Sequence, residues 1–388
     1  MLIVSLDLGK FSSMACNLDT TDRTPEFNAV ATDRHYLKAF FRQHHPDLVV
    51  MEACGPSGWI SDLCQELGLR TLVCSTNGEA WQWCNVKRKT DRDDAYKLAR
   101  LASLNELSPV HVPTAIVRER RALIKYRKTL DHRINRLKNS IRSHFANRGI
   151  PIDTGKRAWC SGRNHIDNFR KPLAECSVDE LWKGSLDLEL TQLDDLATHL
   201  KTVEARLEEI AKTCTHTQRL MTIPGVGRKT AEALVVTIDD PHRFKNDRQL
   251  SSYLGLVPKQ YQSGQTDRNG HITKRGNRLL RTLLVECAWC STRYNHWAKE
   301  TYQRIHGGQK TRRKKAGIAL ARKIAVLAWA MMRDELNWDA TRCGQMGTGA
   351  IKVHQRPNRP PGPVHAEAPA FSSGRSKRLS RRKRPVKC

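Results

Sequence analysis

The sequence lacks any apolar run long enough to cross a membrane. Its longest apolar stretch near the end, Ile324 to Met332, is flanked by Arg322, Lys323 and Arg333. A spanning helix needs about 20 apolar residues, so this stretch is too short. No signal peptide precedes the first strand-like segment. We therefore expect no membrane partner and a cytoplasmic, nucleoid-associated protein of a prokaryotic cell.

A disulfide framework and a structural zinc site are not indicated either. The twelve cysteines are scattered, often within apolar patterns, as reduced intracellular thiols are. Cys287 and Cys290 form a single C-x-x-C pair, and no second pair or histidine pair lies nearby to complete a zinc site. We interpret this pair as neighbours on a buried helix face.

Acidic residues are scarce relative to basic ones. The chain has 67 Lys and Arg against 39 Asp and Glu, which gives a formal net charge of +28. Such a protein binds polyanions, and its binding weakens strongly with salt. Composition alone fits a nucleic-acid enzyme and a non-catalytic binder of the ribosomal or histone-like kind equally well. The length of 388 residues with 39% hydrophobic residues allows two or three domains with real cores.

Residue patterns divide the chain into four segments. Residues 1–109 alternate strand-like and helical patterns and predict an α/β domain. Residues 110–215 contain two long helical patterns, which we expect to pair as an antiparallel coiled-coil arm, for dimerisation or as a spacer. Residues 216–335 predict a mainly α domain, and residues 336–388 a basic tail that is disordered when free. In the first segment, strands are expected near residues 2–8, 26–31, 47–52 and 70–75.

Four acids occupy the positions of metal ligands in a ribonuclease H-like (RuvC-like) fold. Asp7 and Glu52 each end an apolar run, and Asp91 and Asp94 begin a helical pattern three residues apart, so that both project from one face. Clustered carboxylates repel one another unless a cation binds. Two Mg²⁺ ions held by these acids would stabilise the attacking and leaving oxygens of a phosphodiester. The alternative is that each acid is a surface group or a helix cap, above all Asp91, which follows Thr90.

A rival interpretation of the first apolar run concerns the segment Leu6-Asp7-Leu8-Gly9-Lys10. It also fits the first phosphate loop of a sugar-kinase or actin-like fold, which shares the strand topology. That fold needs further glycine-rich phosphate loops, and none is evident in the sequence. The high positive charge is unusual for a sugar kinase as well.

A second motif, Ile223-Pro224-Gly225-Val226-Gly227, matches a helix-hairpin-helix signature. Its glycines allow a tight turn whose backbone N–H groups face a DNA phosphate, and the next helix adds its dipole. Such a motif binds DNA without reading its sequence. The alternative is an ordinary glycine-containing turn between helices. The nucleic-acid-binding residues would be Gly225, Gly227, Arg228, Lys229 and Thr230.

A third motif joins Ser263, which precedes Gly264, to a basic cluster. The glycine would let the backbone approach a phosphate, and Lys274, Arg275 and Asn277 would clamp that phosphate. Ser263 is either a nucleophile or a turn residue, and the residues alone favour the turn. Tyr261 is a second candidate nucleophile, whose alternative is packing.

Taken in this order, the motifs resemble those of the transposases of the insertion sequence 110 family. These are DEDD-type enzymes, also described as bridge-RNA-guided recombinases. The resemblance covers residues 1–335 and leaves out the basic tail. Two features depart from or complicate the pattern: Gln262 stands where many relatives have a small residue, and Asp93 crowds the last acidic pair.

The resemblance implies an RNase H-like N-terminal domain, a coiled-coil arm and a C-terminal transposase domain. It implies that Ser263 forms a covalent phosphoserine link to the cut strand while the four acids hold Mg²⁺. The partners it implies are donor and target DNA, a structured non-coding guide RNA and further copies of the chain, as a dimer or tetramer with a composite site.

We therefore expect a DNA transposase or recombinase of an insertion sequence. One alternative is a hydrolytic nuclease, such as a junction resolvase, in which the same acids serve water as nucleophile. A second alternative is a non-catalytic nucleic-acid binder. A covalent protein–DNA adduct would separate the first interpretation from the other two.

Within the arm, Arg118 to Arg148 is the more basic half and the expected RNA contact.

Overall fold

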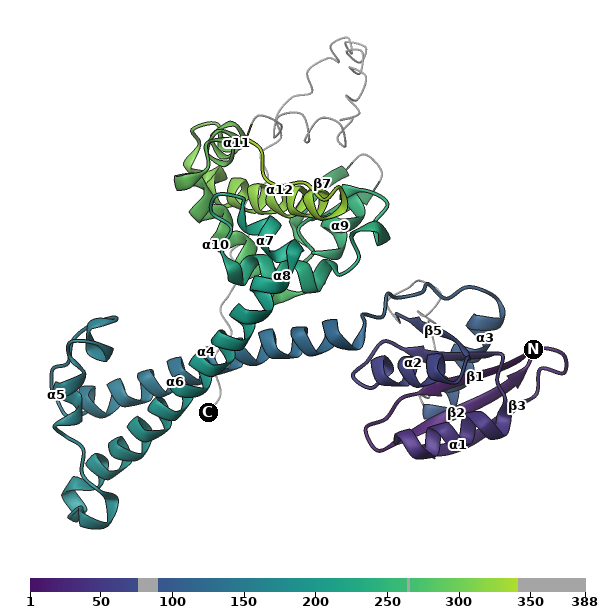
Figure 1. Ribbon diagram of the computed structural model, residues 1–388, viewed down its shortest axis with the longest axis horizontal. Helices are drawn as coiled ribbons and strands as arrows, with labels where there is room; N and C mark the ends of the chain where they lie inside the picture. The colour runs from purple at the N-terminus through teal and green to yellow at the C-terminus, as the bar shows by residue number, and fades with distance from the viewer. Residues whose placement is uncertain (76–89, 264–265, 341–388) are drawn as a thin grey trace, which may run out of the picture. The chain divides into compact units, whose positions relative to one another are not determined.

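The computed structural model describes residues 1–75, 90–263 and 266–340 (Figure 1). Its N-terminal part is built on a five-stranded sheet in the order β3-β2-β1-β4-β5. The first three strands pair antiparallel, whereas β4 and β5 run parallel to β1. The strands are β1 (Leu2–Asp7), β2 (Ser12–Asp19), β3 (Pro25–Ala31), β4 (Leu48–Glu52) and β5 (Arg70–Cys74).

Helices cover both faces of this sheet because alternate strand residues are apolar on both sides. On one face Leu6 and Met51 join the core formed with α1 (Arg34–His44) and α2 (Ser57–Glu66). On the other face Ile3, Val50 and Cys74 pack against α3 (Asp91–Ser103), and Figure 1 shows this layering. The mixed α/β sheet agrees with the expected nuclease-like fold.

Strand β2 was not predicted from the sequence, whereas the other four strands were. Ser12, Ser13 and Asn17 interrupt the apolar residues of β2, which weakens its alternation. The strand is held instead by pairing with β1 on one side and β3 on the other. Its stability therefore comes from tertiary neighbours more than from its own pattern.

Two long helices follow, α4 (Ala115–Ala146) and α6 (Leu181–Thr213). Phe145 near the end of α4 packs with Leu186 near the start of α6. Leu130, earlier in α4, packs with Leu207, late in α6. The two helices therefore run antiparallel, as Figure 1 shows. The coiled-coil character of this pair stays a prediction.

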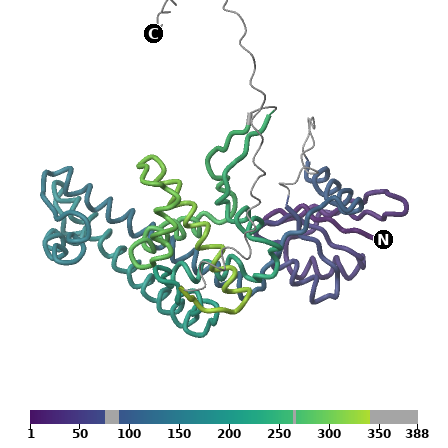
Figure 2. Tube along the Cα trace, turned by 90° about the horizontal axis from the view of Figure 1, so that it is seen from above, coloured from purple at the N-terminus to yellow at the C-terminus, as the bar shows by residue number. Residues whose placement is uncertain are grey.

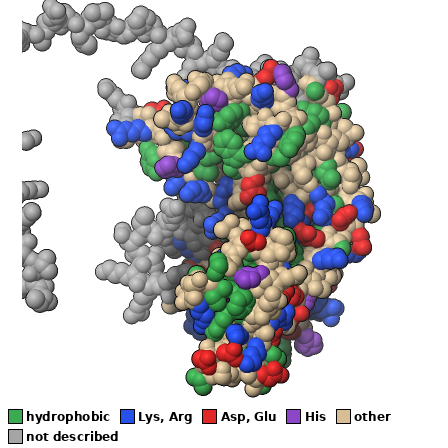
Figure 3. Space-filling view, turned by 90° about the vertical axis from the view of Figure 1, so that its left-hand side faces the viewer, with side chains coloured by type: hydrophobic (Ala, Val, Ile, Leu, Met, Phe, Trp, Pro, Cys, Tyr) green, Lys and Arg blue, Asp and Glu red, His purple; other side chains and the backbone are tan. Residues whose placement is uncertain are grey.

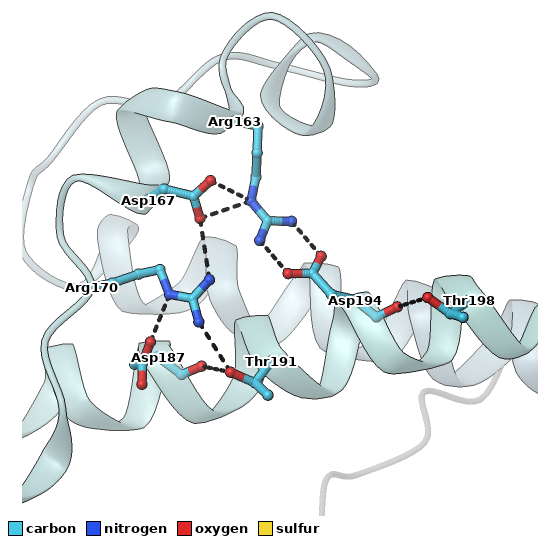
Figure 4. A network of polar contacts seen from close by, with 7 residues as sticks. All are labelled: Arg163, Asp167, Arg170, Asp187, Thr191, Asp194 and Thr198. Carbon is cyan, nitrogen blue, oxygen red and sulfur yellow. Dashed lines mark hydrogen bonds and ion pairs between the residues drawn. The ribbon is translucent and has the colours of Figure 1, made fainter.

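The segment between the long helices is tied to α6 by ion pairs (Figure 4). Arg163 donates to Asp167 and to Asp194 of α6, in each case at 2.9 Å. Arg170 donates to Asp187 of α6 at 2.6 Å. Short helices make up this segment. They are η2 (Arg157–Trp159), α5 (Arg163–Asp167), η3 (Leu173–Glu175) and η4 (Val178–Glu180).

The C-terminal part is mainly helical around α8 and α12. All residues from Thr230 to Ile238 in α8 are buried. Trp329 of α12 is buried and its Nε1 donates to Pro241 O at 2.7 Å. The elements are α7 (Thr215–Met221), α8 (Arg228–Ile238), η5 (Pro241–Arg243), α9 (Asp247–Tyr253), α10 (Arg278–Tyr294), α11 (His296–His306), η6 (Lys310–Arg312) and α12 (Arg313–Arg333).

One β-hairpin, which was not predicted from the sequence, interrupts these helices. It consists of β6 (Pro258–Ser263) and β7 (Thr266–Ile272), paired antiparallel. Figure 2 shows it in green, projecting from the helices of the C-terminal part.

Several helices begin at a polar side chain that accepts a hydrogen bond from a backbone N–H of the first turn, a preferred helix start. These capping residues are Asp33, Thr90, Thr114, Asn246, Asn277 and Asn295.

Among the described residues, no helix is both long and apolar enough to span a bilayer. The expected domain limits after residues 109 and 335 fall between elements, whereas the limit after residue 215 falls one residue inside α7 (Thr215–Met221); all three stay predictions.

Candidate active site

Two of the four candidate acids end neighbouring parallel strands. Asp7 is the last residue of β1 and Glu52 the last of β4, and the register places these two strand ends next to each other. Ile3 lies four residues before Asp7 and Val50 lies two residues before Glu52. Both pack against α3. Because strand side chains alternate, Asp7 and Glu52 also project to the face that α3 covers.

Helix α3 brings the other two acids to the same face. The buried hydroxyl of Ser5 donates to Ala95 O at 2.6 Å, which fixes the start of α3 on the strand that carries Asp7. Asp91, Asp94 and Ala95 are spaced so that they share one face of the helix. Since Ala95 packs on the sheet, Asp91 and Asp94 lie on the sheet-facing side.

Asp93, the acid next to this pair, interacts with the residue that caps α3. The Thr90 hydroxyl accepts from Asp93 N at 3.2 Å and donates to Asp93 Oδ2 at 2.7 Å. Thr90 thus caps the helix, and the Asp93 carboxylate accepts a hydrogen bond from the capping hydroxyl. The cap of α3 is Thr90 and not Asp91, which answers the alternative interpretation of Asp91 as a cap.

The negative charge of this region acts on two thiols. Desolvation raises the pKa of Cys54, and the charges of Glu52 and Asp7 raise it further. Burial raises the pKa of Cys74 to about 11, with a further contribution from Glu52. Both effects are consistent with two carboxylates concentrated at this end of the sheet.

The carboxylates are not drawn together into a preformed ligand cage. Within residues 1–75, 90–263 and 266–340, no three Asp, Glu, His or Cys side chains are arranged to hold a metal ion. Like charges repel, so carboxylates need a cation between them to draw together. The backbone gathers the acid-bearing positions at one end of one sheet face, whereas the ligand geometry stays a prediction.

Ser5, whose hydroxyl joins α3 to β1, was not among the predicted site residues. Its signal was present, because Ser5 is the one polar residue inside the apolar run from Leu2 to Leu6. A polar residue buried in a central strand needs a hydrogen-bond partner.

Ser263 is the last residue of β6, where the chain turns toward β7. It pairs with Thr266 in the hairpin register, and every residue of β6 is exposed. The exposure makes the Ser263 hydroxyl accessible to a large substrate. Gly264, which was expected to let the backbone approach a phosphate, lies outside the described residues.

The basic cluster after the hairpin is held by close backbone contacts. A Cβ at Gly255 would collide with the backbone of Arg275, and one at Gly276 with Tyr253 O. Both glycines have positive φ, which a larger residue tolerates poorly. Lys274 and Arg275 are exposed, so their side chains are accessible to an anion.

Asn277 stabilises the fold, in addition to the phosphate contact that was expected of it. Its Oδ1 accepts from Leu280 N at 3.1 Å and caps α10, and its Nδ2 donates to Thr237 Oγ1 at 3.3 Å. Both ends of the side-chain amide therefore have partners inside the protein. A role of Asn277 in clamping phosphate stays a prediction.

The motif between α7 and α8 forms a turn packed on α10. Gly225 has φ of +95° and leaves no room for a Cβ beside Ser291. Gly227 precedes the first residue of α8, whereas Thr230 is buried.

The two cations that begin α8 contact the arm. Lys229 Nζ lies 2.5 Å from Glu204 Oε1, and Arg228 donates to Glu204 O at 3.1 Å. The hydrogen bond from Lys229 lowers the pKa of Glu204. Sequence spacing gave no signal for this contact, because Glu204 belongs to a different helix.

Comparison with known proteins gives two family matches. Residues 217–303 match the model described as Transposase IS116/IS110/IS902 family, and residues 4–147 match the DEDD model described as Transposase. The first segment contains Ser263 and the second contains all four acids.

Three relatives extend over most of the chain. The transposase for insertion sequence element IS1111A of Coxiella burnetii is 29% identical over 88% of this chain and 92% of its own length. The transposase for insertion sequence element IS1328 of Yersinia enterocolitica is 25% identical over 77% and 87%. The pilin gene-inverting protein of Moraxella lacunata is 27% identical over 66% and 69%.

Proposed function

This chain belongs to the IS116/IS110/IS902 family of transposases, and we propose that it cuts and rejoins DNA through a covalent link between Ser263 and the cut strand. The observation that carries the proposal is the meeting of Asp7, Glu52 and the first turn of α3 at one end of the sheet. Gene inversion, which the name of the Moraxella lacunata relative states, also requires strands to be cut and rejoined.

The four acids fit divalent metal ions by the chemistry of their donors. Asp7, Glu52, Asp91 and Asp94 offer only carboxylate oxygens, the ligands that Mg²⁺ prefers. Asp7 and Glu52 end adjacent strands, so a cation between them would offset the repulsion of their negative charges. When bound, one or two Mg²⁺ ions would polarise the scissile phosphate and stabilise charge on its oxygens.

Ser263 supplies the nucleophile in this proposal. Its hydroxyl oxygen gives up its proton and forms a bond to phosphorus, the bond from phosphorus to the sugar oxygen breaks, and that oxygen takes up a proton, so that no net proton is gained or lost. One phosphate ester replaces another, so the link retains the bond energy and rejoining needs no ATP. Lys274 and Arg275, both exposed, would neutralise charge that develops on the phosphate.

Nucleic acids are the proposed partners on grounds of charge. The net charge of +28 favours donor and target DNA together with a structured non-coding guide RNA. The turn before α8, with Gly225 and Gly227, would contact DNA phosphate as a helix-hairpin-helix motif. We further propose that two or four copies assemble, with acids and serine of one site supplied by different copies.

The test is the replacement Ser263→Ala. With labelled element DNA, guide RNA and Mg²⁺, the wild-type chain should give a covalent adduct on a denaturing gel, and the variant should give none while still binding DNA. Tyr261→Phe is the matched control in the same exposed strand and should keep the adduct. An adduct that persists in Ser263→Ala would exclude this serine. Cleavage without any adduct in the wild type would indicate a hydrolytic nuclease.

A further inference from the structure

The segment from Thr301 to Arg333 contains nine Lys and Arg residues and no Asp or Glu. Six of the nine fall within twelve residues, where α11 ends and α12 begins. We call these six the α11–α12 junction. They are Arg304, Lys310, Arg312, Arg313, Lys314 and Lys315.

The charges of the junction are not neutralised by ion pairs within the described part of the chain. All six residues are exposed, and none takes part in an ion pair in the portion of the chain that the structure describes. By contrast, Arg163 and Arg170 of the arm are each bound to carboxylates of α6. The junction thus presents unneutralised positive charge to solvent.

Without a bound partner, repulsion among these like charges destabilises the folded protein. Arg313, Lys314 and Lys315 form the first turn of α12, where the helix dipole is also positive. No acid stands in that turn, and Lys310 and Arg312 directly precede it. Repulsion among these groups would be relieved by a bound polyanion.

The local backbone leaves the junction open. Gly307 and Gly308 have positive φ and turn the chain between α11 and η6. A Cβ at either glycine would meet nothing within 4 Å, so the turn has free space around it. In the upper part of the face drawn in Figure 3, over the C-terminal helices, Lys and Arg side chains are far more frequent than Asp and Glu.

The chemistry of the junction selects one class of partner. Closely spaced, exposed cations match the repeating phosphates of a nucleic acid. No Phe, Tyr or Trp occurs between Gln303 and Ala328, and the ring of His306 already packs against Tyr302 with ring centroids 4.8 Å apart, so the segment offers little ring surface on which an unpaired base would stack. The surface therefore fits a duplex backbone better than a single strand.

We propose that the α11–α12 junction is a binding surface for the phosphate backbone of a nucleic-acid duplex. It shares no residue with the turn before α8 or with the cluster at residues 274–277. The junction holds a duplex without reading its bases. The inference goes beyond the proposed cleavage, and its test measures binding alone, so that its failure leaves the Ser263 experiment untouched.

The test variant replaces Arg312, Arg313, Lys314 and Lys315 with Gln in the full chain. Its matched control replaces four basic residues of the N-terminal part, Arg23, Lys38, Arg42 and Arg70, which lowers the net charge equally. Affinities are measured over a series of salt concentrations for a DNA duplex, an RNA duplex, single-stranded DNA and anionic phospholipid vesicles. Circular dichroism checks that both variants fold.

The junction variant should bind a duplex at least about 100-fold more weakly near ~0.1 M salt, with a salt slope smaller by up to about 3.6, which is about 0.9 for each of the four lost phosphate contacts. The control should change much less. Loss on the DNA duplex, the RNA duplex or both supports the proposal and identifies the source of the phosphates. Equal loss in variant and control, or loss confined to single strands or vesicles, overturns it. If the fourfold variant does not fold, Lys314→Gln and Lys315→Gln should each lower the slope by about 0.9.

Discussion

Glu204 is the residue that most directly affects the proposed DNA-binding turn, because it contacts the two cations that follow the turn. It lies on α6, yet its carboxylate and its carbonyl hold Lys229 and Arg228 at the start of α8. A negative group therefore occupies the surroundings in which a DNA phosphate is proposed to bind. Because the pKa of Glu204 is lowered in the folded protein, the pair contributes stability above the unfolded pKa and loses it as the pH falls.

Replacing Glu204 with Gln should raise affinity for duplex DNA. The change removes the charge that neutralises Lys229 while keeping the shape of the side chain. A partly exposed ion pair is worth up to about 1 kcal/mol, so the gain should be at most about fivefold. Titrations of labelled duplex at several salt concentrations would measure it.

Glu208→Gln is the matched control for this change, because Glu208 lies one turn further along α6 and pairs with Lys212 at 3.2 Å. An equal gain in both variants would mean that net charge alone, and not release of Lys229, sets the affinity.

At the scale of elements, the first turn of α3 has the most direct consequence for the site. Thr90, hydrogen-bonded to Asp93, caps the helix that carries Asp91 and Asp94. Thr90→Ala should lower the free energy of unfolding by about 1 kcal/mol, as loss of a helix cap does. It should also lower the yield of adduct, since the first turn holds two of the four acids. Urea unfolding and the adduct gel measure the two effects.

Thr21→Ala provides the comparison, because Thr21 is exposed in a turn and caps no helix. If both threonine variants unfold alike, the cap does not stabilise α3. An unchanged adduct yield in Thr90→Ala would show that the first turn is positioned without its cap.

The elements also show what sequence patterns reveal and what they leave out. The convergence of Asp7 and Glu52 was predictable, because each ends an apolar run and parallel strands end at one edge of a sheet. Strand β2 and the hairpin of Ser263 were missed, since polar residues break their alternation and pairing partners stabilise them. The capping by Asn277 is a local signal, visible once the start of α10 is known.

At the scale of the whole molecule, the basic excess falls into two kinds. Some cations of the arm, such as Arg163, are bound by carboxylates and fix the segment between its helices. Those of the α11–α12 junction have no such partners in the described part of the chain. Composition gave the net charge and hence the class of partner, but only tertiary structure separates structural cations from those left for a ligand.

The proposed sharing of one site between copies leads to the last prediction. Asp7→Asn removes an acid and Ser263→Ala removes the nucleophile, so each variant alone should form no adduct. In a mixed dimer with shared sites, the Asp7→Asn copy donates its intact serine to the intact acids of the other copy. Random mixing would then restore roughly a quarter of the wild-type adduct.

A size tag on the Asp7→Asn copy makes this result specific. The restored adduct should migrate at the size of the tagged copy, because that copy carries the only intact Ser263. If acids and serine act within one chain, no mixture can restore the adduct, since each copy lacks one half of its own site. A mixture that stays inactive, although the two variants co-purify, would therefore assign the whole site to a single copy.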